Sequence, residues 1–160
     1  MKKLLMVLGL MLAAAQVSAA GVDAKKIYFG GGLGLNDANF GDNAIGFQVF
    51  VGLPLPVKTE SVKLSVEAGY MDSGNFEKNL GIFGKVKTKA NGLWGTAVAE
   101  LPLKDNLSVL GRIGLDIGDD DGIMIGAGLG LKMAQNMDLR FEYVIRDTID
   151  SLQVNLVIRQ

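Results

Sequence analysis

Apolar and polar residues alternate along most of the chain, most clearly over residues 138–159. Leu139, Phe141 and Tyr143 alternate there with charged residues, and a second alternating run follows the polar segment 147–150. Successive side chains of a β-strand point to opposite faces of the sheet. Two such runs joined by a short polar loop predict an antiparallel hairpin with one apolar and one charged face.

The same period-2 pattern predicts six further strands in the preceding part of the chain. They cover residues 26–35, 44–53, 62–70, 92–101, 107–117 and 123–133. The sequence has 22 glycines and 3 prolines, and polar or proline-containing turns separate the predicted strands. The pattern is less regular between 71 and 91, where we expect the part 81–88 to extend the flanking strands. The chain is therefore predicted to be all-β, with eight strands.

The two faces of these strands allow two arrangements. In a soluble barrel the apolar face would enclose an apolar ligand, whereas in a transmembrane barrel it meets lipid and the polar face lines the lumen. The charged face carries both signs, so its members can pair inside a narrow lumen, and we expect the transmembrane arrangement. The residues expected in this lumenal charge network are Lys63, Glu67, Glu100, Arg112, Asp116, Lys132, Arg140, Glu142, Arg146 and Arg159.

The N-terminal segment has the features of a secretory signal peptide. Two lysines at positions 2 and 3 precede an apolar run, and small residues at 17 and 19 permit cleavage. The apolar run is shorter than the roughly 20 residues that a membrane-spanning helix needs. We therefore expect residues 1–20 to be removed and residues 21–160 to form one barrel domain.

Charge and composition restrict the classes of function. Loss of residues 1–20 removes two of 16 basic residues and none of 17 acidic ones, which leaves a net charge of −3 and gives no indication of a nucleic-acid partner. Histidine and cysteine are absent, so a histidine base and a disulfide framework are both excluded. Ser65, Ser108 and Ser151 have no evident general base. We expect no catalytic, cofactor-binding or metal-binding residues.

Three segments carry a resemblance to a known family: 105–114, 126–131 and 138–143. They resemble the eight-stranded outer-membrane barrels of the OmpA/OmpX-like superfamily, also described as outer-membrane β-barrel domains or opacity-type porins. The resemblance extends over the mature chain, although this chain ends in Arg159-Gln160 and family members usually end in an aromatic residue. It implies an antiparallel, up-and-down transmembrane β-barrel in the bacterial outer membrane of a Gram-negative cell.

The resemblance is less specific about activity, because members of such a fold serve different functions. It implies contacts with outer-membrane lipid and lipopolysaccharide, and an extracellular protein or other surface partner. We expect a monomer with a plugged polar lumen and a structural or surface-interaction role, in adhesion or envelope integrity. The alternatives are an outer-membrane lipid-modifying enzyme and the soluble periplasmic barrel with an apolar ligand.

Three groups of residues could each serve a specific function or have only a structural or solvent-exposed role. The lumenal charges would form an ion path or a structural plug, and we expect a plug because an eight-stranded barrel is so narrow. Aspartates at 37, 42, 119–121, 147 and 150 would bind a divalent cation or form a solvated rim, and they lack a metal-loop spacing. Lysines of the long segment would contact lipopolysaccharide phosphates or simply face solvent. These lysines are Lys78, Lys85, Lys87 and Lys89.

Aromatic residues could form belts at the two membrane surfaces. The candidates are Phe29, Tyr70, Trp94 and Tyr143. Alternation within 92–101 places Trp94 on the polar face. Either this strand is assigned in the wrong register, or Trp94 packs inside the lumen.

Overall fold

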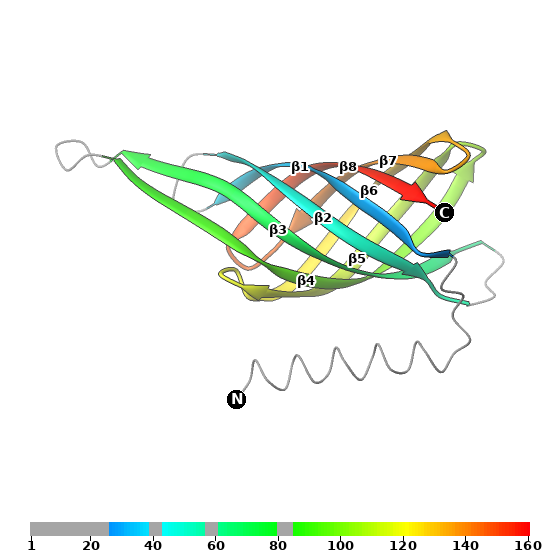
Figure 1. Cartoon of the computed structure of the whole chain (residues 1–160), viewed down its shortest axis with the longest axis horizontal. Coiled ribbons are helices and arrows are strands. Elements are labelled where there is room, and N and C mark those ends of the chain that lie inside the picture. The colour runs from blue at the N-terminus through cyan, green and yellow to red at the C-terminus, as the bar shows by residue number, and fades with distance from the viewer. Residues whose placement is uncertain (1–25, 39–42, 57–60, 80–84) are drawn as a thin grey trace, which may run out of the picture.

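The computed structural model describes residues 26–38, 43–56, 61–79 and 85–160, so the predicted signal peptide lies outside it. Eight antiparallel strands follow one another around a closed barrel, which β1 and β8 close by pairing (Figure 1). The strands are β1 (Tyr28–Ala38), β2 (Ala44–Pro54), β3 (Lys63–Asn79), β4 (Lys85–Lys104), β5 (Leu107–Gly118), β6 (Gly122–Ala134), β7 (Met137–Ile145) and β8 (Ile149–Arg159). The predicted all-β, eight-stranded, up-and-down barrel is confirmed. No helix in these residues is long and apolar enough to cross a membrane.

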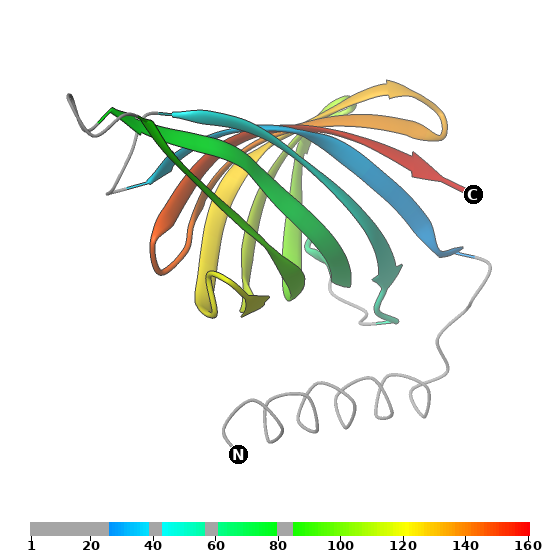
Figure 2. The ribbon, with the colours of Figure 1, turned by 60° about the vertical axis from the view of Figure 1, so that its left-hand side comes forward.

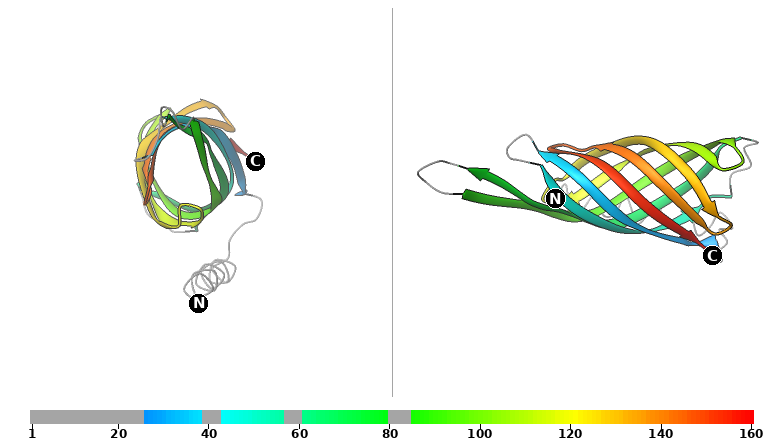
Figure 3. Two further views of the ribbon diagram at one scale, coloured as in Figure 1. Left: turned by 90° about the vertical axis from the view of Figure 1, so that its left-hand side faces the viewer. Right: turned by 90° about the horizontal axis from the view of Figure 1, so that it is seen from above.

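β3 and β4, with 17 and 20 residues, run past the predicted ranges 62–70 and 92–101. The expected extension through 81–88 is confirmed for 85–88, which belong to β4, whereas 81–84 lie outside the described residues. β2 pairs with β3 as far as Asp72, and β5 pairs with β4 from Gly92 onward. Beyond those positions β3 and β4 pair only with each other, and their hairpin projects past the barrel (Figures 1 and 3). The alternation looked irregular here because the register shifts between Asp72 and Asn75, where Gly74 has a φ of 77°.

The barrel has two distinct ends. At one end, called here the terminal end, β1 begins, β8 ends, and short turns connect β4 to β5 and β6 to β7 (Figure 2). The opposite end, called the loop end, carries the projecting β3–β4 hairpin and the connections of β5 to β6 and β7 to β8. Seen along its axis the barrel forms a closed ring (Figure 3).

The outward face of the barrel is apolar. Leu33, Ile45 and Ile113 are 62%, 72% and 60% exposed, and similar residues continue around all the strands. Soluble monomers rarely expose apolar patches larger than a few hundred Å², so this surface fits lipid. Glu67, Arg112 and other charged residues are buried on the opposite face. The alternative of a soluble barrel with an apolar interior is therefore wrong, and the expected transmembrane arrangement is confirmed.

Inward-facing glycines make room for large lumenal side chains. A Cβ atom at Gly30 would collide with the Phe50 ring, and one at Gly52 would collide with the Tyr28 ring. Gly128 lies against the Glu142 side chain and the Phe141 carbonyl in the same way. The glycines that alternate with outward apolar residues thus provide the space that the lumenal side chains occupy.

Candidate functional site

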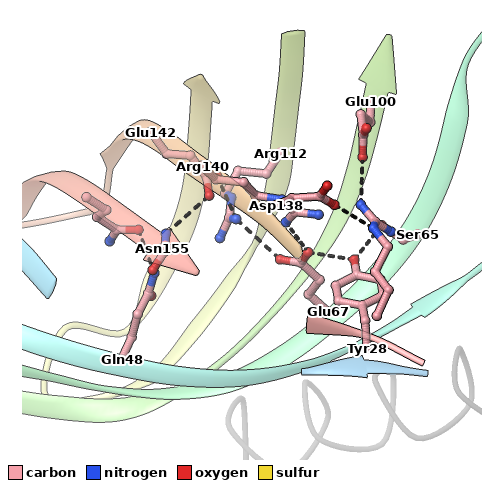
Figure 4. A network of polar contacts seen from close by, with 12 residues as sticks. Tyr28, Gln48, Ser65, Glu67, Glu100, Arg112, Asp138, Arg140, Glu142 and Asn155 are labelled. Carbon is pink, nitrogen blue, oxygen red and sulfur yellow. Dashed lines mark hydrogen bonds and ion pairs between the residues drawn. The ribbon is translucent and has the colours of Figure 1, made fainter. Parts of the chain in front are cut away.

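Glu67 on β3 is the centre of a buried charge cluster in the lumen (Figure 4). Its Oε2 lies 3.2 Å from Nη2 of Arg112 on β5, and its Oε1 accepts a hydrogen bond of 2.6 Å from Nη1 of Arg140 on β7. The Tyr28 hydroxyl of β1 donates to Glu67 Oε1 at 2.6 Å. One carboxylate therefore joins three other strands across the interior.

Arg112 and Glu142 extend the cluster. Arg112 Nη2 lies 2.6 Å from Glu142 Oε2, and the amide of Asn155 donates to Glu142 Oε1 at 3.2 Å. All the charged groups of this central cluster are almost completely buried. Two guanidinium groups thus face two carboxylates, so the cluster is neutral, which lowers the cost of keeping charge away from water.

Trp94 packs inside the lumen beside this cluster. It is 2% exposed, its ring lies 5.6 Å from that of Phe50, and the Arg112 guanidinium lies 5.5 Å from its centre. Of the two alternatives for Trp94, packing inside the lumen is therefore confirmed, and Trp94 is not a belt residue. β4 keeps its predicted alternation, and Gly69 leaves room opposite the indole.

The other belt candidates lie on the outer face. Phe29 and Tyr143 are about half exposed, and Tyr70 packs with its ring 6.4 Å from that of Phe47. The Tyr143 hydroxyl also donates to Asp150 at 3.0 Å, at the loop end. These positions suit side chains with an apolar ring and a polar tip.

A polar layer lies next to the central cluster on its loop-end side. The Gln48 amide donates to the side-chain oxygens of Gln153 and Asn155, both at 2.8 Å. The predicted lumenal network did not include these three residues, although each of them alternates with outward apolar residues along its strand. A search for every polar residue at an inward position, and not for charges alone, would have found all three.

A second charge cluster occupies the loop end of the lumen. Arg146 Nε lies 3.2 Å from Asp116 Oδ2, and its Nη1 donates to the Ser151 hydroxyl at 2.8 Å. Ser151 in turn donates to Asn36 at 2.5 Å, and the Asn36 amide donates to the Ser73 carbonyl at 2.8 Å. Asn36 was predicted to lie in a loop, but the alternation of β1 continues through it and its side chain is buried.

The remaining residues of the predicted network lie at the terminal end. Arg159 forms ion pairs of 2.6 Å with Asp138 and 3.2 Å with Glu100. Lys63 lies 3.9 Å from Glu100, with its side chain 69% exposed, and Lys132 is also exposed. The structure thus divides the ten predicted residues into a central cluster, a loop-end cluster and a terminal-end group.

The acidic residues at the loop end do not converge on one point. Asp120 is 6% exposed and accepts hydrogen bonds from the Thr148 amide and hydroxyl at 3.0 and 2.6 Å. Asp119 accepts one from the Asn91 amide at 3.1 Å. The expectation of a solvated rim is therefore wrong for Asp120. Within the described ranges, which exclude Asp42, no three acidic side chains are placed to hold a metal ion.

Two of the four hairpin lysines form ion pairs with carboxylates on the neighbouring strand. Lys87 lies 2.7 Å from Glu77, and Lys89 lies 2.6 Å from Asp72. The hydrogen bond to Asp72 raises the pKa of Lys89 above its usual value. The side chains of Lys78 and Lys85 lie outside the described part of the chain.

Comparisons with known proteins agree with this architecture. Ail of Yersinia pestis, in a phospholipid bilayer nanodisc, has a TM-score of 0.61 and 12% identity over 84% of this chain and 99% of its own. A de novo designed transmembrane β-barrel has a TM-score of 0.55 and 16% identity over 86% of this chain and 98% of its own. A second design, TMB2.3, has a TM-score of 0.55 and 18% identity, with coverages of 84% and 93%. At these identities the likeness shows the fold alone.

The sequence itself identifies the family. No curated protein sequence matches the chain significantly. The family described as outer membrane protein beta-barrel domain, however, matches residues 5–157, which is nearly the whole chain. The chain therefore belongs to the outer membrane protein beta-barrel domain family and is a transmembrane β-barrel of the bacterial outer membrane.

Proposed function

We propose that this barrel is a closed, non-conducting outer-membrane protein with a structural or surface-interaction role. The observation that carries the proposal is the central cluster, in which side chains from β1, β3, β5 and β7 meet across the lumen. Buried ions of opposite sign that are paired with one another are costly to separate. An open water-filled path would require that separation.

Packing in the loop-end half of the lumen supports the same proposal. The void next to Gln48 and Gln153 measures about 10 Å³, which is room for about one water molecule. An eight-stranded barrel has an interior just wide enough to be filled by its own side chains. The lumenal charges then act as a plug and not as an ion path.

Single-channel recording in planar bilayers tests the plug. We expect wild-type protein to give no conductance steps. A variant in which Glu67, Arg112, Arg140 and Glu142 are all replaced by serine removes two charges of each sign and should conduct. The matched control, Glu77→Gln with Lys87→Gln, removes an ion pair outside the lumen and should remain closed. Steady conductance of the wild-type protein would contradict the proposal.

We infer that the role is not catalytic. The Ser65 hydroxyl lies 2.9 Å from that of Tyr28, and Ser151 is held between Arg146 and Asn36. Ser108 lies 3.4 Å from the Gly130 carbonyl. Among the described residues, each of the three serines thus contacts structural partners, and no histidine, lysine or carboxylate is hydrogen-bonded to it as a general base would be. Turnover of lipid A or phospholipid by the purified protein would instead support the lipid-modifying enzyme.

The barrel is proposed to be a monomer that inserts with its terminal end in the periplasm, after removal of residues 1–20. Short periplasmic turns and longer extracellular loops are usual in this class. The projecting β3–β4 hairpin is then extracellular, where it offers a surface to an extracellular protein partner (Figure 1).

The hairpin lysines are proposed to contact lipopolysaccharide phosphates. Lys87 and Lys89 are about half exposed or more, so each ammonium can reach a phosphate while keeping its carboxylate neighbour. We expect Lys78, Lys85, Lys87 and Lys89 replaced together by glutamine to lower the affinity for lipopolysaccharide vesicles, in a co-sedimentation assay. Lys26→Gln at the terminal end is the control, and equal binding by both variants would rule out the contact.

A further inference from the structure

A cavity of about 210 Å³ opens at the terminal end of the barrel. The ends of β3 to β8 and the turns between them line it. Its charged lining residues are Lys63, Glu100, Lys104, Asp105, Lys132, Asp138, Arg140 and Arg159. Glu67 neutralises the charge of Arg140, and the four other cations against three carboxylates still leave this lining with an excess of positive charge.

The carboxylates of the cavity are mostly neutralised. Glu100 and Asp138 both form ion pairs with Arg159, and Glu100 also lies near Lys63. Among the described residues, no carboxylate oxygen lies within 4.0 Å of the ammonium groups of Lys104 and Lys132. These two lysines therefore have their charge available to a ligand.

The floor of the cavity adds buried hydrogen-bond donors. Arg140 is 2% exposed and lines the cavity, and its one hydrogen bond to a described residue runs from Nη1 to Glu67. A guanidinium has five N–H donors, so others remain for a ligand. The Ser108 hydroxyl also lies on the cavity lining, and its one hydrogen bond within the described part of the chain is a long contact of 3.4 Å with the Gly130 carbonyl.

We propose that this cavity is a binding site for a phosphate group. A buried arginine fork together with lysine ammonium groups is a common arrangement for phosphate recognition. The cavity is smaller than the roughly 300–1,000 Å³ of sites for drug-sized ligands, so it suits a small anion or one headgroup. Free inorganic phosphate and a phospholipid headgroup present the same chemistry. The proposed orientation of the barrel would place this site in the periplasm, but binding of phosphate at the site does not depend on that orientation.

NMR titration of the folded protein tests the proposal. Protein in octyl glucoside, a detergent without phosphate, is titrated with inorganic phosphate while the amide signals of Ser108, Gly130 and Lys132 are followed. We expect saturable shifts at these residues. Lys104→Gln combined with Lys132→Gln should weaken the apparent affinity roughly tenfold or more, as loss of charge-assisted hydrogen bonds does. Lys87→Gln, at the loop end, is the matched control and should bind like wild type.

A second titration separates the two sources of phosphate. In phosphatidylglycerol nanodiscs, loss of the response to free phosphate means that a lipid headgroup already occupies the site, and a retained response identifies free phosphate as the ligand. Absence of saturable shifts in octyl glucoside, or equal affinity of the double variant and wild type, would overturn the proposal. Both lysines are exposed, so these variants are expected to fold, and a heat-dependent change in gel mobility checks that they do.

Discussion

At the scale of single residues, the interior depends on a few buried charges. Glu67 interacts with Arg112, Arg140 and Tyr28 at once, whereas Arg112 also has Glu142 as a partner. Removing Glu67 therefore leaves Arg140 buried beside Tyr28 without its main counter-charge. An uncompensated buried charge is far more costly than the loss of an exposed pair.

Glu67→Gln is expected to lower the free energy of unfolding by about 3–5 kcal/mol. Lys87→Gln breaks an exposed ion pair and should cost below about 1 kcal/mol. Urea unfolding of the two variants in lipid vesicles measures both values. Equal effects would show that the central cluster contributes no more than a surface pair.

The sequence predicted which residues face the lumen but not how deep each of them lies. Glu67 and Lys63 are on the same face of the same strand, yet Glu67 is buried in the centre and Lys63 is 69% exposed at the terminal end. Depth and pairing depend on the stagger between neighbouring strands, such as the register that places Lys63 beside Glu100. Alternation within one strand carries no information about that stagger.

At the scale of strands, an inward-facing glycine on one strand lies opposite a large side chain on the neighbouring strand. On β6, Gly128 faces inward between Leu110 and Glu142, whereas Gly111 on β5 pairs with Ala127 on the outer face. A Cβ atom at Gly128 would collide with the Phe141 carbonyl, while one at Gly111 would meet only the Gly126 carbonyl, at 3.9 Å. The two glycines are therefore predicted to differ in their tolerance of substitution.

Gly128→Ala is expected to destabilise the barrel or prevent its folding, because the clash is with backbone and β6 must shift to relieve it. Gly111→Ala should fold and unfold like wild type. Heat-dependent gel mobility and urea unfolding in vesicles compare the two variants. If Gly128→Ala is as stable as Gly111→Ala, inward packing is looser than the structure indicates.

The bounds of a strand could be predicted where apolar and polar residues alternate without interruption. β5, β6 and the last hairpin lie close to their predicted ranges, because every second residue in them is apolar. The extension of β3 to Asn79 was not predicted, because the shift at Asp72 and Asn75 reverses which positions face outward. A bulge of this kind has no sequence signal stronger than a glycine, here Gly74 with its positive φ.

At the scale of the whole molecule, the barrel has its apolar surface outside and its charges inside. This arrangement requires lipid around the barrel, and the family assignment agrees with it. In a channel with this arrangement, ions would pass through the polar lumen. The central cluster lies in that space with its neighbours Trp94 and Phe50, and we propose that it closes the lumen.

Fluorescence quenching of Trp94, the one tryptophan of the sequence, tests both parts of this account. In vesicles we expect it to resist acrylamide from the aqueous side and brominated lipid from the membrane side, since its ring is buried and the lumen is proposed to be plugged. The control combines Leu93→Trp with Trp94→Phe, which moves the indole to the exposed neighbouring position, where brominated lipid should quench it strongly. Strong acrylamide quenching of wild-type Trp94 would contradict the plug, and lipid quenching equal to that of the control would contradict the inward register.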